Sequence, residues 1–159
     1  AAALAEHYGA DVTDAARAGM LHDVTKALTA EEQLKLCEEY GMILNHFERE
    51  NPKLLHAKTG AAVARRLFGE NDAVCSAIEW HTTGRAGMSL LEKIIYLADY
   101  VEPSRDFDGV EELRQLTWQN LDAAMLLGLE MTMQQLREKG STIGPDSLAA
   151  YQYFQKERA

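Results

Sequence analysis

Histidine and aspartate side chains in apolar surroundings are typical metal ligands, and the segment "AGMLHDVTK" (residues 18–26) places one of each side by side. His22 and Asp23 are flanked by apolar residues, so we expect them to project from a helix whose neighbours form the core. An unpaired carboxylate is costly to bury. Asp23 therefore needs a cation, a set of hydrogen-bond donors or access to water.

Three further apolar segments each carry one residue of the same kind. His56 lies in "LLHAKTGAAVARRLF", His81 lies in "AIEWHTTGRAG", and Asp99 lies in "LLEKIIYLADYVEP". Two carboxylates and three imidazoles that converge on a divalent ion satisfy one another, because the ion neutralises both acids and orders the rings. The pattern therefore indicates a metal centre.

Each of these residues also has a plain structural interpretation. A His–Asp dipeptide is a weak signal by itself, and it also fits a capped helix end with Asp23 exposed and His22 half-buried. A lone histidine such as His56 is more often a core or surface residue than a ligand. His81 could be a C-terminal cap that the helix dipole favours. Only the combination of the segments favours a metal centre.

Composition and charge exclude several classes of protein. The 159 residues are 47% apolar and 26% charged, which is typical of one soluble globular domain. The formal net charge of −9 argues against binding to nucleic-acid polymers, which requires a basic surface, but local cations could still bind a small anion. Charged residues interrupt the most apolar segment, so no membrane span is predicted. Cys37 and Cys75 match no metal-type spacing and favour reduced thiols in a cytoplasm over a disulfide.

Helical spacing and helix punctuation recur along the chain, whereas alternating strand patterns are nearly absent, so the predicted class is all-α. Thr29 with Glu32, and Ser89 with Glu92, each fit a capping box at a helix start. The expected helix over residues 110–138 could break near Thr117. The expected helices, about seven in number, span residues 12–26, 30–40, 51–68, 71–81, 89–102, 110–138 and 145–157.

The order of three segments carries a family resemblance. "LHD", then "LLHAKTGA", then "WHTTGRAGMSLLEKIIYLADYVEPSRDFDGVEELR" resembles the HD-domain phosphohydrolases, and specifically the YqeK-type symmetrical diadenosine tetraphosphate hydrolases. The resemblance extends from about Leu4 to about Tyr153. It implies a single HD-domain helical bundle over residues 1–159. It also implies a divalent metal centre, with iron first and manganese, cobalt or magnesium as substitutes, that cleaves diadenosine tetraphosphate into two ADP molecules.

The resemblance implies roles for individual residues. His22, Asp23 and Asp99 match metal ligands of the family. His56 and His81 match groups that line the metal and phosphate pocket, either as ligands of a second metal or as phosphate contacts. Together these five residues are the expected catalytic set. Either of the last two histidines could also protonate the leaving ADP, since an ordinary imidazole titrates near cellular pH.

The nucleotide contacts are expected from four further residues. Lys26 resembles a phosphate-binding lysine, and Tyr100 and Arg105 resemble nucleotide contacts. Arg85, in the polar loop after His81, would join Lys26 and Arg105 in offsetting the charge of the polyphosphate.

Two positions depart from the family's pattern. The family has a further metal-ligating histidine in a helix upstream of "LAEHYGAD", so the chain is expected to lack its natural N-terminal helix; His7 is in the wrong register to replace that residue. The family also tends to have a histidine after the isoleucine of "STIGPDS", where this chain has Gly144.

Alternative functions remain open at the level of the sequence. The metal constellation is shared by HD-type nucleotidases that act on mononucleotides, and an incomplete metal site would suit a nucleotide-binding regulatory module. The expected ligand is accordingly a dinucleoside polyphosphate or a nucleotide of the ADP or GDP kind. A homodimer is compatible with the sequence, which favours neither a membrane nor a nucleic-acid partner.

Overall fold

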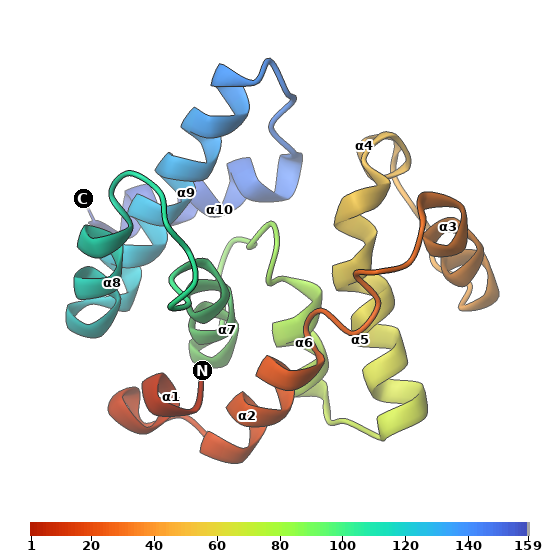
Figure 1. Ribbon diagram of the computed structural model, residues 1–159, viewed down its shortest axis with the longest axis horizontal. Helices are drawn as coiled ribbons and strands as arrows, with labels where there is room; N and C mark the ends of the chain where they lie inside the picture. The colour runs from red at the N-terminus through yellow and green to blue at the C-terminus, as the bar shows by residue number, and fades with distance from the viewer. Residues whose placement is uncertain (159) are drawn as a thin grey trace.

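The computed structural model describes residues 1–158, which form ten α-helices, one 3-10 helix and no strands (Figure 1). The all-α prediction is therefore confirmed, although the expected number of about seven helices is too low. The helices are α1 (Ala2–Tyr8), α2 (Val12–Leu21), α3 (Ala30–Glu39), α4 (His46–Glu50), η1 (Pro52–Leu54), α5 (Leu55–Phe68), α6 (Asp72–Glu79), α7 (Leu90–Tyr100), α8 (Val110–Gln119), α9 (Leu121–Glu138) and α10 (Pro145–Arg158).

The second helix is shorter than predicted, since α2 ends at Leu21 and not at residue 26. Residues 22–28 form successive turns, in which the amide of Lys26 bonds the carbonyl of Asp23. The hydroxyl of Thr25 donates to the carbonyl of His56, 3.0 Å away. This tertiary hydrogen bond holds the chain in the turn, so His22 and Asp23 follow the helix and do not lie within it.

Other differences have local causes. The predicted helix over 51–68 begins as the 3-10 turn η1 at Pro52, and α5 starts only at Leu55. Two short helices, α1 and α4, were not predicted. The long segment 110–138 is divided at Asn120, whose backbone is extended and whose side chain accepts from the amide of Ala123, so the break falls slightly after the expected position.

The two predicted capping boxes are confirmed, and a glycine ends α5. Thr29 with Glu32 and Ser89 with Glu92 form complete capping boxes, in which each side chain bonds the other residue's amide. Gly69 follows α5 in the left-handed region, at a φ of 65°. These caps satisfy amide and carbonyl groups that a helix end leaves unpaired, so they fix where α3, α5 and α7 begin or end.

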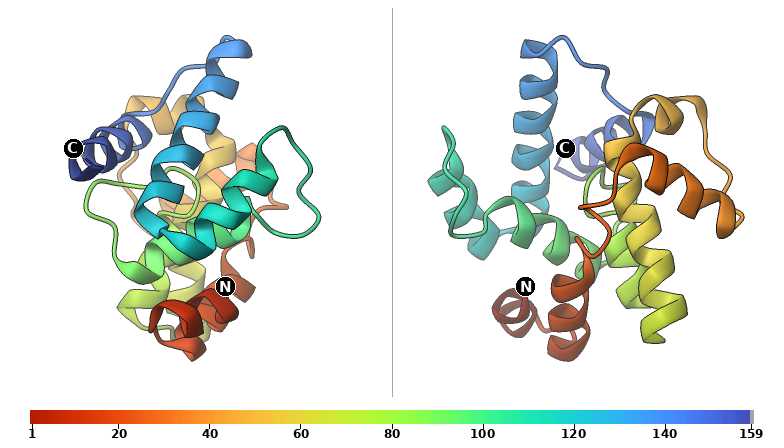
Figure 2. Two further views of the ribbon diagram at one scale, coloured as in Figure 1. Left: turned by 90° about the vertical axis from the view of Figure 1, so that its left-hand side faces the viewer. Right: turned by 45° about the vertical axis from the view of Figure 1, so that its right-hand side comes forward.

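The core surrounds α7, which packs against α2, α6 and α9 (Figures 1 and 2). Ile78 of α6, Ile94 and Leu97 of α7 and Met125 of α9 are fully buried there. Residues of α8 and α10 belong to the same apolar cluster, including the buried Phe154. Helices α3 and α4 lie on the other flank, beside α5 (Figure 2). Cys37 and Cys75 are buried free thiols, as predicted.

A close approach of α5 positions the turn after α2. A Cβ on Gly60 would lie 3.4 Å from Cγ2 of Ile78 and 3.5 Å from the carbonyl oxygen of His22. The lack of a side chain at Gly60 therefore lets α5 approach both α6 and the turn that carries His22. Within residues 1–158, no helix combines the length and the apolar content needed to cross a bilayer.

Candidate metal centre

The five residues predicted as the catalytic set converge from four parts of the fold. His22 and Asp23 come from the turn after α2, His56 from the first turn of α5, His81 from the end of α6, and Asp99 from the last turn of α7. We call these five residues the His/Asp cluster. Their meeting excludes the interpretation of five unrelated core or capping residues.

Asp23 lies at the middle of the His/Asp cluster. Its Oδ1 is 3.3 Å from Nε2 of His56 and 3.5 Å from Nε2 of His81, and its Oδ2 is 3.3 Å from Nε2 of His22. Nε2 of His22 is also 3.4 Å from Oδ1 of Asp99. One carboxylate therefore faces three imidazoles, and the second closes the ring from α7.

The three imidazoles are oriented in the same way by the backbone. Nδ1 of His22 lies 2.7 Å from the carbonyl oxygen of Gly19, and Nδ1 of His56 and His81 each lie 2.6 Å from the carbonyl three residues earlier. Carbonyl oxygens only accept, so each Nδ1 must carry the proton. In the neutral rings, Nε2 is then an acceptor directed at the centre of the cluster, which is the arrangement that outer hydrogen bonds give to metal-binding histidines.

Two acceptor atoms at the centre of the cluster lack hydrogen-bond donors. Nε2 of His56 and Nε2 of His81 are 3.2 Å apart, so in the neutral rings two lone pairs face each other. Among the described side chains, Nε2 of His22 and Oδ1 of Asp23 are buried without a hydrogen-bond partner. Ligand atoms of His22, Asp23 and His81 all lie within 4.8 Å of one another. A shared cation would satisfy these atoms, so the donor set fits a divalent metal.

The electrostatics of the cluster agree with a site built for positive charge. The carboxylate of Asp99 beside His22 raises the pKa of that imidazole, whereas burial lowers the pKa of His56. Contact with His81, together with His22 and Lys26, holds the pKa of Asp23 well below its usual range. Both a proton and a metal ion can supply the positive charge that Asp23 requires, and they compete for it.

Two cavities flank the His/Asp cluster. The smaller, about 390 Å³, is lined by His22, Asp23, Asp99 and Arg105 among others, and Nη2 of Arg105 is 3.2 Å from Oδ1 of Asp99. The larger, about 890 Å³, exposes mostly apolar surface although many of its lining residues are polar, and Lys26 and His56 are among them. Nζ of Lys26 is 3.2 Å from Oδ2 of Asp23, so this lysine joins the larger cavity to the cluster.

Two predicted nucleotide contacts lie outside these cavities. Nε and Nη2 of Arg85 donate to the carboxylate of Glu92 at 3.0 and 2.9 Å, so both of these donors are already used within the protein. The ring of Tyr100 stacks on Phe107, and its hydroxyl lies 3.3 Å from Oγ1 of Thr132. Thr132, and not Tyr100, lines the larger cavity.

The larger cavity also contains residues that the sequence analysis missed. Short polar residues from the loops before α7 and α10 and from the first turn of α10 line it, and so does one aromatic ring from α4; they are Thr82, Thr83, Ser141, Thr142, Ser147 and Phe47. The sequence indicated the polar loop after His81, which contains Thr82 and Thr83, but not as a wall of this cavity. Nothing in the sequence near Phe47 distinguishes it from an ordinary packing residue.

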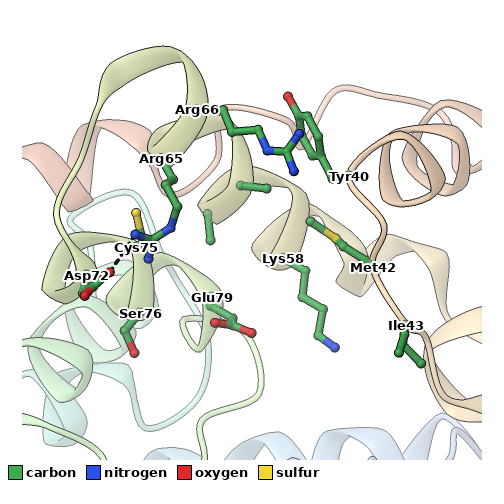
Figure 3. Close-up of a pocket in the computed structure, with 12 residues that line it drawn as sticks. Tyr40, Met42, Ile43, Lys58, Arg65, Arg66, Asp72, Cys75, Ser76 and Glu79 are labelled. Carbon is green, nitrogen blue, oxygen red and sulfur yellow. Dashed lines mark hydrogen bonds and ion pairs between the residues drawn. The ribbon is translucent and has the colours of Figure 1, made fainter.

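A third hollow, of about 570 Å³, lies on the outer side of α5 and α6 (Figure 3). The guanidinium of Arg66 lies over the ring of Tyr40, and Arg65 pairs with Asp72 at 2.6 Å. No member of the His/Asp cluster lines this hollow. It is therefore separate from the candidate metal centre.

Comparison with known proteins agrees with the geometry. Residues 1–104 match the HD domain family model. The chain belongs to the HD domain family. It is 40% identical over 152 residues to a symmetrical bis(5'-nucleosyl)-tetraphosphatase of Bacillus subtilis, covering 95% of this chain and 81% of the relative. A relative of the same name from Halalkalibacterium halodurans is 42% identical over 93% of this chain and 79% of its own length.

A solved structure shows the same fold. It is described as a predicted HD superfamily hydrolase involved in NAD metabolism from Clostridium acetobutylicum. It matches with a TM-score of 0.95 and 38% identity, over 98% of this chain and 83% of that one. The resemblance drawn from the sequence is thus confirmed at the level of family and fold.

Proposed function

We propose that the protein hydrolyses diadenosine tetraphosphate symmetrically, so that one water and one dinucleotide give two ADP molecules. The observation that carries this proposal is the His/Asp cluster, in which acceptor atoms of His22 and Asp23 are buried without hydrogen-bond partners beside a large cavity, as metal-ligating atoms would be. The names and the high coverage of the relatives support the substrate and the symmetry of cleavage.

His22, Asp23 and Asp99 would hold the metal, and His56 and His81 would either bind a second ion or contact the phosphates. A divalent ion bound there supplies a water of lowered pKa and polarises the phosphoryl group. Iron is the proposed metal, with manganese, cobalt or magnesium as substitutes. The mixed imidazole and carboxylate donors suit these ions better than a site made of thiolates would.

The chain's own cations would offset the charge of the polyphosphate. The side chain of Lys26 is 54% exposed and stands between the cluster and the larger cavity, so its ammonium can contact phosphate oxygens. Arg105 lines the smaller cavity and lies beside Asp99 of the cluster, so its guanidinium can also contact phosphate oxygens. Arg85 is not assigned to this task, because it lines neither cavity and its guanidinium makes two hydrogen bonds to the buried Glu92.

Residues 1–159 are proposed to act as one HD domain in the cytoplasm. Support for a single domain comes from the core, since Leu129 of α9 and Phe154 of α10 belong to the same apolar cluster as Ile78 of the family-matched segment. The polyphosphate is proposed as the partner of the site, and a second copy of the chain as a partner of the protein.

The test is product identification with metal-loaded protein. Protein purified without oxygen and loaded with ferrous iron is incubated with diadenosine tetraphosphate, and the nucleotides are separated by chromatography. ADP as the sole product supports the proposal, and AMP with ATP overturns the symmetry of cleavage. Faster turnover of AMP or dGDP would instead identify a nucleotidase. Binding of ADP without any turnover would identify a regulatory module.

A further inference from the structure

Phe47 and Gly144 meet in the wall of the larger cavity, and their contact leaves no room for a side chain at position 144. A Cβ on Gly144 would lie 2.6 Å from Cε1 and 2.8 Å from Cζ of Phe47. Gly144 does not have a positive φ, so its backbone does not require glycine. What distinguishes glycine at this position is therefore the space that it leaves for the ring of Phe47.

Both sides of this contact are held by hydrogen bonds and an ion pair. Helix α4, which carries Phe47, is joined to α5 by the ion pair of Glu48 with Lys58. The start of α10, next to Gly144, is joined to the loop after α6 because the hydroxyl of Ser147 donates to the carbonyl of Thr83 at 3.1 Å. These contacts tie the segments on both sides of the half-buried ring of Phe47 to the rest of the fold.

The surroundings of the ring fit a nucleobase. The cavity that Phe47 lines is mostly apolar, and Lys26 and His56 line the same cavity beside the His/Asp cluster. A ligand that combines an uncharged apolar part with an anionic part matches both features, and a nucleotide has both. Aromatic side chains bind nucleobases by stacking, whichever base is present, because every base has a π face.

We propose that Phe47 stacks on a nucleobase of the bound nucleotide and that Gly144 is required because it leaves the ring free to do so. Phe47 and Gly144 then determine affinity for the nucleoside part of the ligand, whereas Lys26 and the His/Asp cluster determine affinity for the polyphosphate. This inference rests on the proposed function for the identity of the ligand.

The first test separates the base from the phosphates. Calorimetry measures binding of ADP and of inorganic tripolyphosphate, which has no base, to the wild type and to Phe47→Leu, Phe47→Trp and Phe68→Leu. Phe68 is the matched control, because it is 51% exposed at the end of α5 and does not line the cavity. We expect Phe47→Leu to weaken ADP binding roughly tenfold, the loss of one stacking contact. Tripolyphosphate binding should stay unchanged, and Phe47→Trp should retain ADP. Equal weakening of both ligands, or of neither, overturns the inference.

The second test uses the glycine. Gly144→Ala places a methyl group against the ring, so it should weaken ADP binding in the presence of Phe47. In a Phe47→Ala background the ring is gone, and the same change should have little further effect. Additive losses in this double-mutant cycle would contradict the inference. Thermal melting followed by circular dichroism verifies that each variant folds. If a Phe47 variant does not fold, Gly144→Ala still tests the inference, because it leaves Phe47 unchanged.

Failure of this inference and failure of the proposed function give different results. Hydrolysis of diadenosine tetraphosphate by the wild type, with unchanged ADP binding by Phe47→Leu, refutes the role of Phe47 alone. Selective loss of ADP binding in Phe47→Leu, with a wild type that cleaves no dinucleotide, supports the role of Phe47 and refutes the proposed activity.

Discussion

Glu92→Gln should destabilise the fold because it removes the buried charge that holds Arg85. The side chain of Glu92 is 2% exposed at the start of α7. Its Oε1 accepts from Oγ of Ser76 at 2.5 Å and from Nη2 of Arg85 at 2.9 Å. Its Oε2 accepts from Nε of Arg85 at 3.0 Å and from the amide of Ser89 at 3.1 Å. Both carboxylate oxygens are therefore fully engaged.

The size of the effect follows from these contacts. A glutamine has one oxygen and one NH₂ group. In one orientation the NH₂ group meets two donors, Nε of Arg85 and the amide of Ser89; in the other it meets Nη2 of Arg85, while the hydroxyl of Ser76 can turn and accept from it. A hydrogen bond to a charged group contributes ~1.5–3 kcal/mol. Arg85 is 38% exposed and water can solvate its freed guanidinium, which reduces the loss. We expect about 3 kcal/mol, the lower end of the ~3–5 kcal/mol found when a buried ion pair is broken. At ~2–4 °C per kcal/mol, the melting temperature should fall by ~6–12 °C.

The assay is thermal unfolding followed by circular dichroism, together with KM for diadenosine tetraphosphate. Glu111→Gln is the matched control, because Glu111 pairs with Arg114 but its side chain is 73% exposed. That change should cost less than ~1 kcal/mol. An unchanged melting temperature for Glu92→Gln would refute the reasoning. Arg85→Gln with a raised KM and full stability would show instead that Arg85 contacts phosphate, as the sequence suggested.

The pH dependence of the same residue has a defined sign. Burial by itself raises the pKa of Glu92, but hydrogen bonds from Arg85 and Ser76 outweigh it and hold the pKa below the ordinary value. The unfolded chain then binds the proton more readily than the folded chain does. The stability that Glu92 contributes is complete above its ordinary pKa and is lost as the pH falls through the depressed pKa. The difference between wild type and Glu92→Gln should shrink accordingly in acid.

Three further changes have expected outcomes. Asp23→Asn removes the carboxylate at the middle of the His/Asp cluster, so metal affinity measured by chelator competition should fall at least ~10-fold; unchanged affinity would exclude Asp23 as a ligand. Lys26→Ala should leave metal affinity intact but raise KM about fivefold, since an exposed charge contributes ~1 kcal/mol; a wild-type KM would remove Lys26 from the site. Asn120→Ala deletes the cap of α9, and melting should show a loss of ~1 kcal/mol that Asn120→Asp does not share.

Signals that act within one helical turn were readable from the sequence. The capping boxes of α3 and α7 lie where Thr29 and Ser89 precede a glutamate by three residues. The helical spacing of apolar residues, which is also a local signal, predicted the all-α class. The residues of the His/Asp cluster were recognisable by type, because acids and imidazoles in apolar helical sequence are costly unless they share a cation. The likeness of three segments to a known family added the substrate.

Contacts between distant segments were decided only in the folded chain. Helix α2 ends at Leu21 because Thr25 finds the carbonyl of His56, a partner that no pattern near Thr25 reveals. The sequence predicts Arg85 as a phosphate contact, but the folded chain places Glu92, seven residues away, against its guanidinium. A side chain's role depends on the donor, acceptor or charge that packing brings to it. The sequence therefore determined which residues could bind a metal, and tertiary packing decided that they meet.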